Sequence, residues 1–249
     1  MCQVKSGEAV YAGGDLRIYH LPGEDSHNAI REHFHIRDGL GAAASRHTPI
    51  ECIPVRGLFD IEDYDFVFDA GRPDWWEEWM TERAKHELFA AWMAEWDGKT
   101  LVRKGYADLR SLTEIPAGVT LRIGGYADLS SLTTIPAGVT LRIGGDANLI
   151  SLTTIPAGVT LRIGGDANLI SLTTIPAGVT LRIGGCANLS SLTTIPAGVT
   201  LRIGGGANLS SLTTIPAGVK ITIGGEVFDG TRWRKEATFI ARVRRAGRR

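Results

Sequence analysis

The chain carries one twenty-residue sequence six times in succession. The copies begin at Tyr106, Tyr126, Asp146, Asp166, Cys186 and Gly206. Their shared consensus is x-A-[DN]-L-x-S-L-T-[ET]-I-P-A-G-V-[TK]-[LI]-[RT]-I-G-G. A tandem period of about twenty residues indicates coils that stack on one another. One coil cannot bury its apolar face alone, so we expect the six copies to fold only as a stack.

Two short strands are predicted in every coil. In V-T-L-R-I at 139–143 the apolar residues alternate with Thr140 and Arg142, which we expect to point outward. A glycine pair follows and predicts a corner. In D-A-N-L-I at 146–150 the alternation places Ala147 and Leu149 inward. Repeated strands of this kind should form two parallel ladders, with coils about 4.8 Å apart.

The spacing of leucine, isoleucine and proline in each copy matches a known repeat type. In the third copy these residues are Leu149, Leu152, Ile155 and Pro156. The pattern over 106–225 resembles leucine-rich repeats of the short bacterial and phage type. That resemblance implies ligand or protein binding and supplies no catalytic residues. Asn148 directly precedes Leu149 where the family usually has N-x-L, and V-T-L-R-I adds a strand, so a β-helix remains open beside a horseshoe.

Composition divides the chain into three parts. Residues 1–105 hold five of the six tryptophans, with 12 Lys/Arg against 19 Asp/Glu, a net charge of −7. Residues 226–249 have 8 Lys/Arg against 3 Asp/Glu, a net charge of +5. We therefore predict a small acidic α+β domain over 1–105, a six-coil β-solenoid or leucine-rich-repeat-like stack over 106–225, and a basic helical cap and tail over 226–249.

Helices are predicted at both ends of the stack. The N-terminal one covers about 75–96, with Asp74 and Glu77 as capping residues. Its apolar stripe is Trp76, Met80, Ala84, Leu88 and Trp92, widened by Trp75, Trp79, Phe89, Met93 and Trp96. The C-terminal helix is expected over 231–245, with Trp233, Phe239, Ile240 and Val243 on one side. Ahead of the first helix we expect strands at 10–21, 50–55 and 64–69 and a helix at 27–36.

The first and fifth columns of the repeat vary most, and the alternation places both on the surface. A surface that changes over a fixed core is what recognition requires, although exposed positions can also drift freely. Tyrosine, arginine and small apolar spots are typical anchors of protein interfaces. The expected partner-binding residues are Tyr106, Asp108, Arg110, Tyr126, Asp128, Asp146, Ile150, Asp166 and Ile170.

The other predicted ladder carries a column of arginines. Its members are Arg122, Arg142, Arg162, Arg182 and Arg202. Stacked like charges repel, so an anion along them would be stabilising, and an acidic protein or a nucleic acid is the candidate ligand. No aromatic platform for bases lies on this face. The alternative is a solvated column whose aliphatic stems cover apolar surface.

Five histidines fall close together in the N-terminal domain. They are His20, His27, His33, His35 and His47. On a helix the rings of His33 and His35 would point about 200° apart, so we predict no metal site, no cofactor and no catalytic residues there. Cys2 resembles an N-terminal nucleophile only in position. A small enzyme or metal-binding domain fused to a solenoid spacer remains the alternative.

Cysteine use and hydropathy bear on the compartment. The three cysteines, Cys2, Cys52 and Cys186, are far apart and allow no disulfide framework, which suits a reducing cytoplasm. The sequence has neither an apolar signal core nor a membrane span. Together these features favour a non-catalytic cytoplasmic scaffold that presents one solenoid face to a protein partner.

Overall fold

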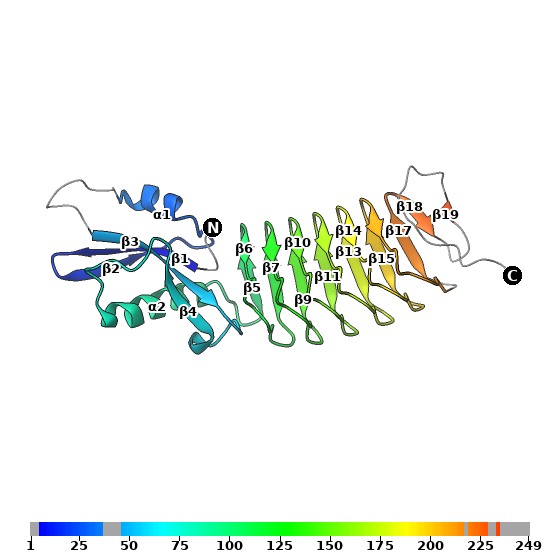
Figure 1. The fold of residues 1–249 in the computed structure, drawn as a ribbon, viewed down its shortest axis with the longest axis horizontal. Helices are drawn as coiled ribbons and strands as arrows, with labels where there is room; N and C mark the ends of the chain where they lie inside the picture. Colours follow the sequence, from blue (N-terminus) through cyan, green and yellow to red (C-terminus); the bar gives the residue numbers. More distant parts are fainter. Residues whose placement is uncertain (1–4, 37–45, 217–218, 229–232, 235–249) are drawn as a thin grey trace.

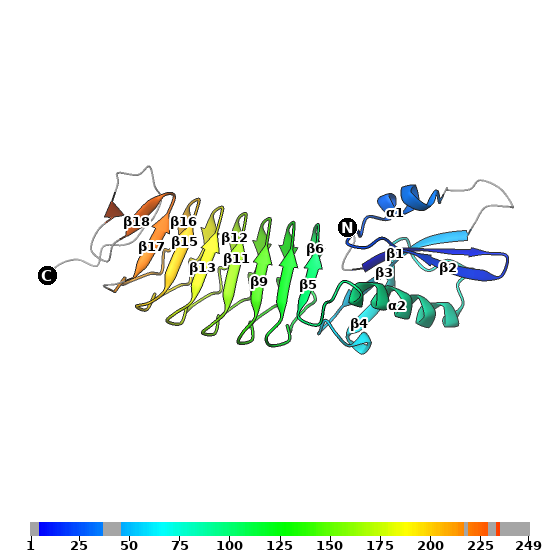
Figure 2. The same cartoon turned by 180° about the vertical axis from the view of Figure 1, so that it is seen from behind.

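The computed structural model describes residues 5–36, 46–216, 219–228 and 233–234, and it shows an α+β domain followed by a rod of stacked coils (Figures 1 and 2). The N-terminal domain is built on an antiparallel sheet in the order β2-β1-β3-β4. Its strands are β1 (Lys5–Ala12), β2 (Asp15–Tyr19), β3 (Arg46–Pro54) and β4 (Tyr64–Phe68). Helix α1 (His27–Phe34) covers one face and α2 (Glu78–Met93) the other, with a short 3-10 turn, η1 (Ile61–Asp63), before β4.

The predicted strand over 10–21 is wrong as a single strand. Its residues belong to the hairpin of β1 and β2, which turns at Gly13 and Gly14. Both glycines have positive φ, 61° and 84°, a conformation that glycine adopts without steric cost. The strands at 50–55 and 64–69 and the helix at 27–36 are confirmed within a few residues.

Helix α2 confirms the predicted apolar stripe but begins later than expected. The five stripe residues are all buried. Glu77 is the N-cap rather than Asp74, because the Trp76 N–H donates to the Pro73 carbonyl (3.0 Å) and closes a separate turn first. Trp79, expected to widen the stripe, is 45% exposed.

Two parallel ladders run the length of the rod. The longer sheet consists of β5 (Thr100–Arg103), β7 (Thr120–Ile123), β9 (Thr140–Ile143), β11 (Thr160–Ile163), β13 (Thr180–Ile183), β15 (Thr200–Ile203) and β17 (Lys220–Ile223), extended by β18 (Glu226–Phe228) and β19 (Trp233–Arg234). The shorter sheet consists of β6 (Ala107–Asp108), β8 (Ala127–Asp128), β10 (Ala147–Asn148), β12 (Ala167–Asn168), β14 (Ala187–Asn188) and β16 (Ala207–Asn208).

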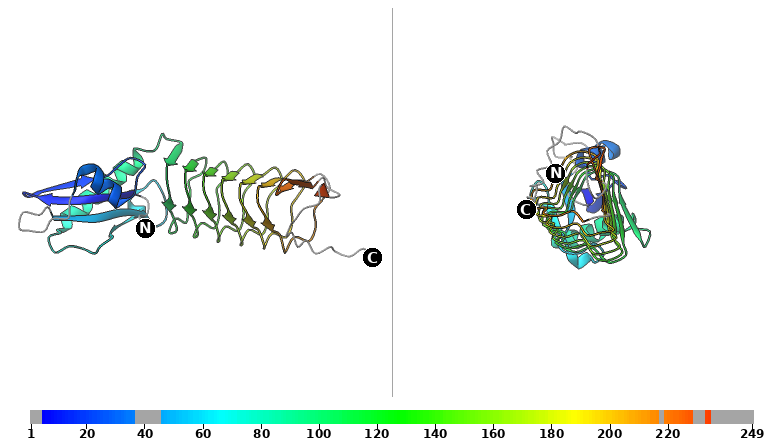
Figure 3. Two further views of the ribbon diagram at one scale, coloured as in Figure 1. Left: turned by 90° about the horizontal axis from the view of Figure 1, so that it is seen from above. Right: turned by 90° about the vertical axis from the view of Figure 1, so that its right-hand side faces the viewer.

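The coils are closed and in register. Each residue of a strand pairs with its equivalent in the next copy, as Arg142 does with Arg162. A third side is held by single parallel bridges, such as Thr134 to Thr154 and Thr154 to Thr174. The rod is therefore a three-sided parallel β-solenoid rather than a horseshoe, as the end-on view shows (Figure 3).

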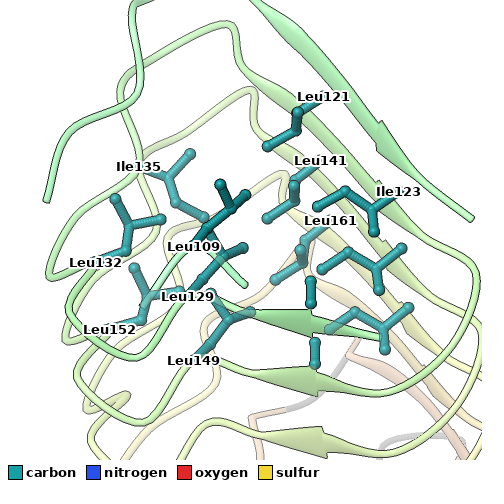
Figure 4. Close-up of a cluster of buried hydrophobic side chains, with 14 of the residues drawn as sticks. Leu109, Leu121, Ile123, Leu129, Leu132, Ile135, Leu141, Leu149, Leu152 and Leu161 are labelled. Carbon is teal, nitrogen blue, oxygen red and sulfur yellow. The ribbon is translucent and has the colours of Figure 1, made fainter. Parts of the chain in front are cut away.

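Aliphatic side chains fill the inside of every coil, and Figure 4 shows them for the coils nearest the N-terminal domain. In the third coil, residues at most 3% exposed are Ala147, Leu149, Leu152, Ile155, Val159, Leu161 and Ile163. Full burial of one Leu or Ile side chain contributes roughly 1.5–3 kcal/mol. Because neighbouring coils cover one another, this gain exists only in the stack.

The glycine pairs are required by close coil approach. Gly144 and Gly145 donate backbone hydrogen bonds to Ile123 (2.7 Å) and Gly125 (3.0 Å) of the preceding coil. A Cβ on Gly164 would lie far inside contact distance of the Gly144 carbonyl oxygen. Gly158, in the Pro-Ala-Gly turn, is different: its φ is 81° and a Cβ there would meet nothing within 4 Å.

The first coil and the N-terminal domain share one hydrophobic core. The fully buried Arg103 guanidinium lies 4.9 Å from the Trp92 ring centroid and pairs with Asp25 and with Glu95 (3.3 Å). Burial lowers the pKa of Arg103 to about 10. Glu95 also accepts from Lys5 (3.1 Å), so paired charges close this end of the solenoid.

The other end departs from the predicted helix over 231–245. Trp233–Arg234 form strand β19, antiparallel to β18, while residues 231–232 and 235–249 lie outside the described residues. The chain turns back at Gly224 and Gly225, both at positive φ, so that β18 pairs with β17. This hairpin covers the ladder edge that the last coil would otherwise leave unpaired.

Alanine should lower the free energy of unfolding by different amounts at a corner glycine and at a glycine of the Pro-Ala-Gly turn. Gly164→Ala should lower the free energy of unfolding by about 3 kcal/mol or more, because coils must separate to admit the methyl group. Gly158→Ala should cost only about 1–2 kcal/mol, the strain of a left-handed alanine. Urea unfolding of the full chain measures both, and equal costs would contradict the close-approach explanation.

Candidate functional site

The variable columns of the repeat point to solvent, as the alternation predicts. Asp146, Ile150, Asp166 and Ile170 are exposed. Leu149 and Leu152, which flank Ile150 in sequence, are fully buried. The register is therefore fixed by the leucines, and the non-identical side chains lie together along the shorter sheet.

Tyr106 and Tyr126 form a stacked pair at the first two coils. Their ring centroids are 5.4 Å apart with an interplanar angle of 9°. Partial burial raises the pKa of both phenols, and the carboxylates of Asp108 and Asp128 add to the effect. Both rings therefore stay neutral near pH 7 and offer a flat aromatic surface with a polar edge.

Asp108 differs from the expectation that it faces a partner. Its side chain is fully buried, and both carboxylate oxygens accept from Arg110, at 2.8 Å from Nε and 2.6 Å from the terminal nitrogen. This bidentate pair raises the pKa of Arg110 and fixes its orientation. Arg110 remains half exposed, so it is the member of the pair that a partner can reach.

The aspartates of the first column also join neighbouring coils. Asp146 Oδ1 accepts from the backbone N–H of Asp166 (2.7 Å), and Asp166 Oδ1 accepts from that of Cys186 (2.6 Å). In the third column, Asp128 Oδ1 makes a similar link between coils by accepting from Asn148 Nδ2 (3.2 Å). Asp146 and Asp166 are nevertheless exposed, and their carboxylates keep this part of the face negative.

Ile150 and Ile170 form an apolar strip beside those carboxylates. They are 40% and 36% exposed, and both are among the five large exposed hydrophobic residues of the described chain. Single exposed apolar residues need no explanation. Two in adjacent coils make a continuous patch, because the strands that precede them are hydrogen-bonded neighbours.

The arginine column lines an open groove of about 830 Å³ on the longer sheet. Its walls come from the five ladder arginines and from the first glycine of each corner, with the isoleucine column of β7 to β15 between them. No ladder arginine forms an ion pair with another described residue. At the N-terminal end Lys104 also lines the groove, while Val102 takes the position that the ladder arginines hold in later coils.

The five histidines that lie close together in the sequence mostly lie apart in the structure. His33 packs on Phe34 in α1, and His35 caps that helix in a left-handed conformation. Burial lowers the pKa of His20. His27 and His47 do meet, around Glu8, in a polar cluster under α1 that sequence spacing gave no means of finding.

Comparison of the chain with protein-family models, curated proteins and solved structures returns no match. Within the described residues, no helix has the length and apolar character needed to cross a bilayer. The surfaces above must therefore be interpreted from their own chemistry.

Thiol reactivity tests the placement of the two described cysteines. Cys186 is exposed in the first column, while Cys52 is buried and its burial raises the thiol pKa to about 12. In a Cys2→Ser background at pH 8, a disulfide reagent should modify Cys186 rapidly and Cys52 only after unfolding.

The raised pKa of Cys52 also makes the stability of the fold depend on pH. Because the unfolded thiol titrates near 9.0, the protonated Cys52 stabilises the fold below that pH, and this contribution is lost as the pH rises toward 12. Rapid labelling of Cys52 in the folded protein would contradict its placement in the buried core.

Proposed function

We propose that the protein is a non-catalytic repeat scaffold that binds a protein partner through one side of its solenoid. The surface, named here the variable face, consists of Tyr106, Arg110, Tyr126, Asp146, Ile150, Asp166 and Ile170. The observation that carries the proposal is the exposed Ile150–Ile170 strip beside a stacked tyrosine pair on an otherwise repetitive rod.

The side chains of the variable face indicate which chemical groups a partner would place against them. The isoleucine strip suits an apolar side chain, the Asp146 and Asp166 carboxylates suit a basic group, and the oriented Arg110 suits an acidic one. The face is preorganised by the hydrogen-bonded ladders, so binding costs little ordering entropy. Aromatic and arginine anchors of this kind supply most of the affinity in protein interfaces.

Two further expectations accompany this function. The spacing of Leu149, Leu152, Ile155 and Pro156 supports kinship with the bacterial and phage type of leucine-rich repeat. The free thiols of Cys52 and Cys186 support a cytoplasmic setting.

The Ile150→Asp/Ile170→Asp variant tests the variable face. Each substitution places a charge where the partner's apolar group must be desolvated, so affinity should fall at least about tenfold, roughly 1.4 kcal/mol or more. Both positions are exposed, so the melting temperature should hardly change. The measurement is quantitative capture from a lysate of the source organism, followed by affinity determination with the captured partner.

The matched control is Thr154→Asp/Thr174→Asp, which adds the same charges to exposed positions on the third side of the same coils. It should capture the partner as the unaltered chain does. Equal capture by both double variants would contradict binding of the partner through the variable face.

The arginine groove supports a second candidate function, binding of an extended acidic segment. Five guanidinium groups at one-coil intervals face solvent, and none is paired within the described residues. A chain of carboxylates along the groove would relieve their mutual repulsion. The groove lacks aromatic side chains, which disfavours nucleic acid as the ligand.

Charge reversal in the ladder tests this candidate. The unaltered chain should bind poly-glutamate with an affinity that falls as salt rises, and Arg142→Glu/Arg162→Glu should weaken that binding about tenfold or more. Arg17→Glu/Arg72→Glu is the control, since these exposed arginines lie in the N-terminal domain. Binding that ignores salt, or that both variants weaken equally, would contradict a specific role for the groove.

A further inference from the structure

A polar cluster lies buried between α1 and the sheet of the N-terminal domain. Glu8 of β1, Glu51 of β3 and His27, the first residue of α1, are 0%, 2% and 6% exposed. Asp69 follows β4 at the edge of the cluster and is half exposed. Residues of β1 alternate between faces, so Glu8 points to α1 while Gly7 packs against Leu88 of α2.

Three side chains of the cluster converge on one point. Nε2 of His27 is 3.4 Å from Oε1 of Glu51 and 4.0 Å from Oδ2 of Asp69. The three ligand atoms all lie within 4.8 Å of one another. Two ligands each about 2.1 Å from a tetrahedral zinc ion are separated by roughly 3.4 Å. The separation between His27 and Glu51 fits two ligands of one ion, and the half-exposed Asp69 must move inward to become the third.

A second layer of residues orients His27. Its Nδ1 is 3.5 Å from Oε1 of Glu8. A proton on Nδ1 shared with Glu8 would leave the lone pair on Nε2, the nitrogen that faces Glu51 and Asp69. Glu8 is held in turn by Nδ1 of His47 (3.2 Å) and by Arg31 (3.5 Å). A carboxylate behind the histidine is the arrangement that fixes the tautomer of metal-binding histidines.

The charge balance of the cluster also calls for cations. Glu8, Glu51 and Asp69 bring three negative charges, and among the described residues Arg31 supplies the permanent positive charge near them. Buried carboxylates are stable only when their charge is compensated. One divalent cation would supply two positive charges that balance the remaining carboxylates of the described cluster.

We propose that His27, Glu51 and Asp69 bind a divalent transition-metal ion of the zinc type, with Glu8 as the positioning residue behind His27. One imidazole and two carboxylates form a donor set that zinc accepts. Three protein ligands leave one coordination position for water, on the side where Asp69 is exposed to solvent. This site is separate from the variable face and from the arginine groove.

Zinc binding to the chelator-treated full chain tests the proposal. Cys2→Ser/Cys186→Ser removes Cys2 and the exposed Cys186, whose thiols could bind zinc themselves. Calorimetric titration with Zn²⁺ should then show one site, and Zn²⁺ should raise the melting temperature. Asp69→Asn should abolish this site, and Glu8→Gln should weaken it about 10- to 100-fold without removing a ligand.

His86→Ala is the matched control, because His86 is an exposed histidine on α2, across the sheet from α1. It should bind zinc as the parent does. Asp69 is half exposed, so Asp69→Asn should stay folded even if changes at buried Glu8 do not. Failure of the parent to bind Zn²⁺, or equal binding by Asp69→Asn, would overturn the proposal.

Discussion

Everything in the solenoid depends on backbone hydrogen bonds that run from coil to coil in register. Each strand residue pairs with its equivalent twenty positions later, and the bonds continue through the glycine corners. At that separation a side chain on Gly144 or Gly164 would collide with the carbonyl of the preceding coil. The sequence therefore repeats because the geometry repeats: every column of the consensus meets the same surroundings in each coil.

A stack of this kind is stable along its length and vulnerable at its two ends. At the first coil the N-terminal domain continues the apolar core, and buried Arg103 and Lys5 share Glu95 as a counter-ion. At the last coil the β18–β19 hairpin pairs with β17. The buried ion pairs at one end and the hairpin at the other both protect a ladder edge from pairing with another chain.

The surfaces divide according to how much they repeat. The arginine column is nearly invariant and extends along five coils, which suits an extended ligand without fine sequence selectivity. The variable face changes within four coils, from stacked tyrosines to an isoleucine strip, which suits one defined partner. The cluster around His27 belongs to neither surface, and its charge balance concerns the N-terminal domain alone.

The sequence by itself determined the period and the inward and outward positions of the strands, because a 2-residue alternation and a fixed repeat leave one register that buries Ala147 and Leu149. It placed Ile150 and Ile170 on the surface correctly for the same reason. It could not show that Asp108 is buried beneath Arg110. Nor could it show that the arginines border a groove, since that depends on how the coil closes.

Only the tertiary structure brought Glu8, His27, Glu51 and Asp69 together. They come from β1, α1, β3 and the position after β4, and strand pairing together with the packing of α1 brings them into contact, so no spacing in the sequence records it. The beginning of α2 and the hairpin at the C-terminal end were decided in the same way, by a local turn at Trp76 and by an unpaired strand edge. Local periodicity fixes which side of an element is buried, whereas long-range packing decides which buried sides meet.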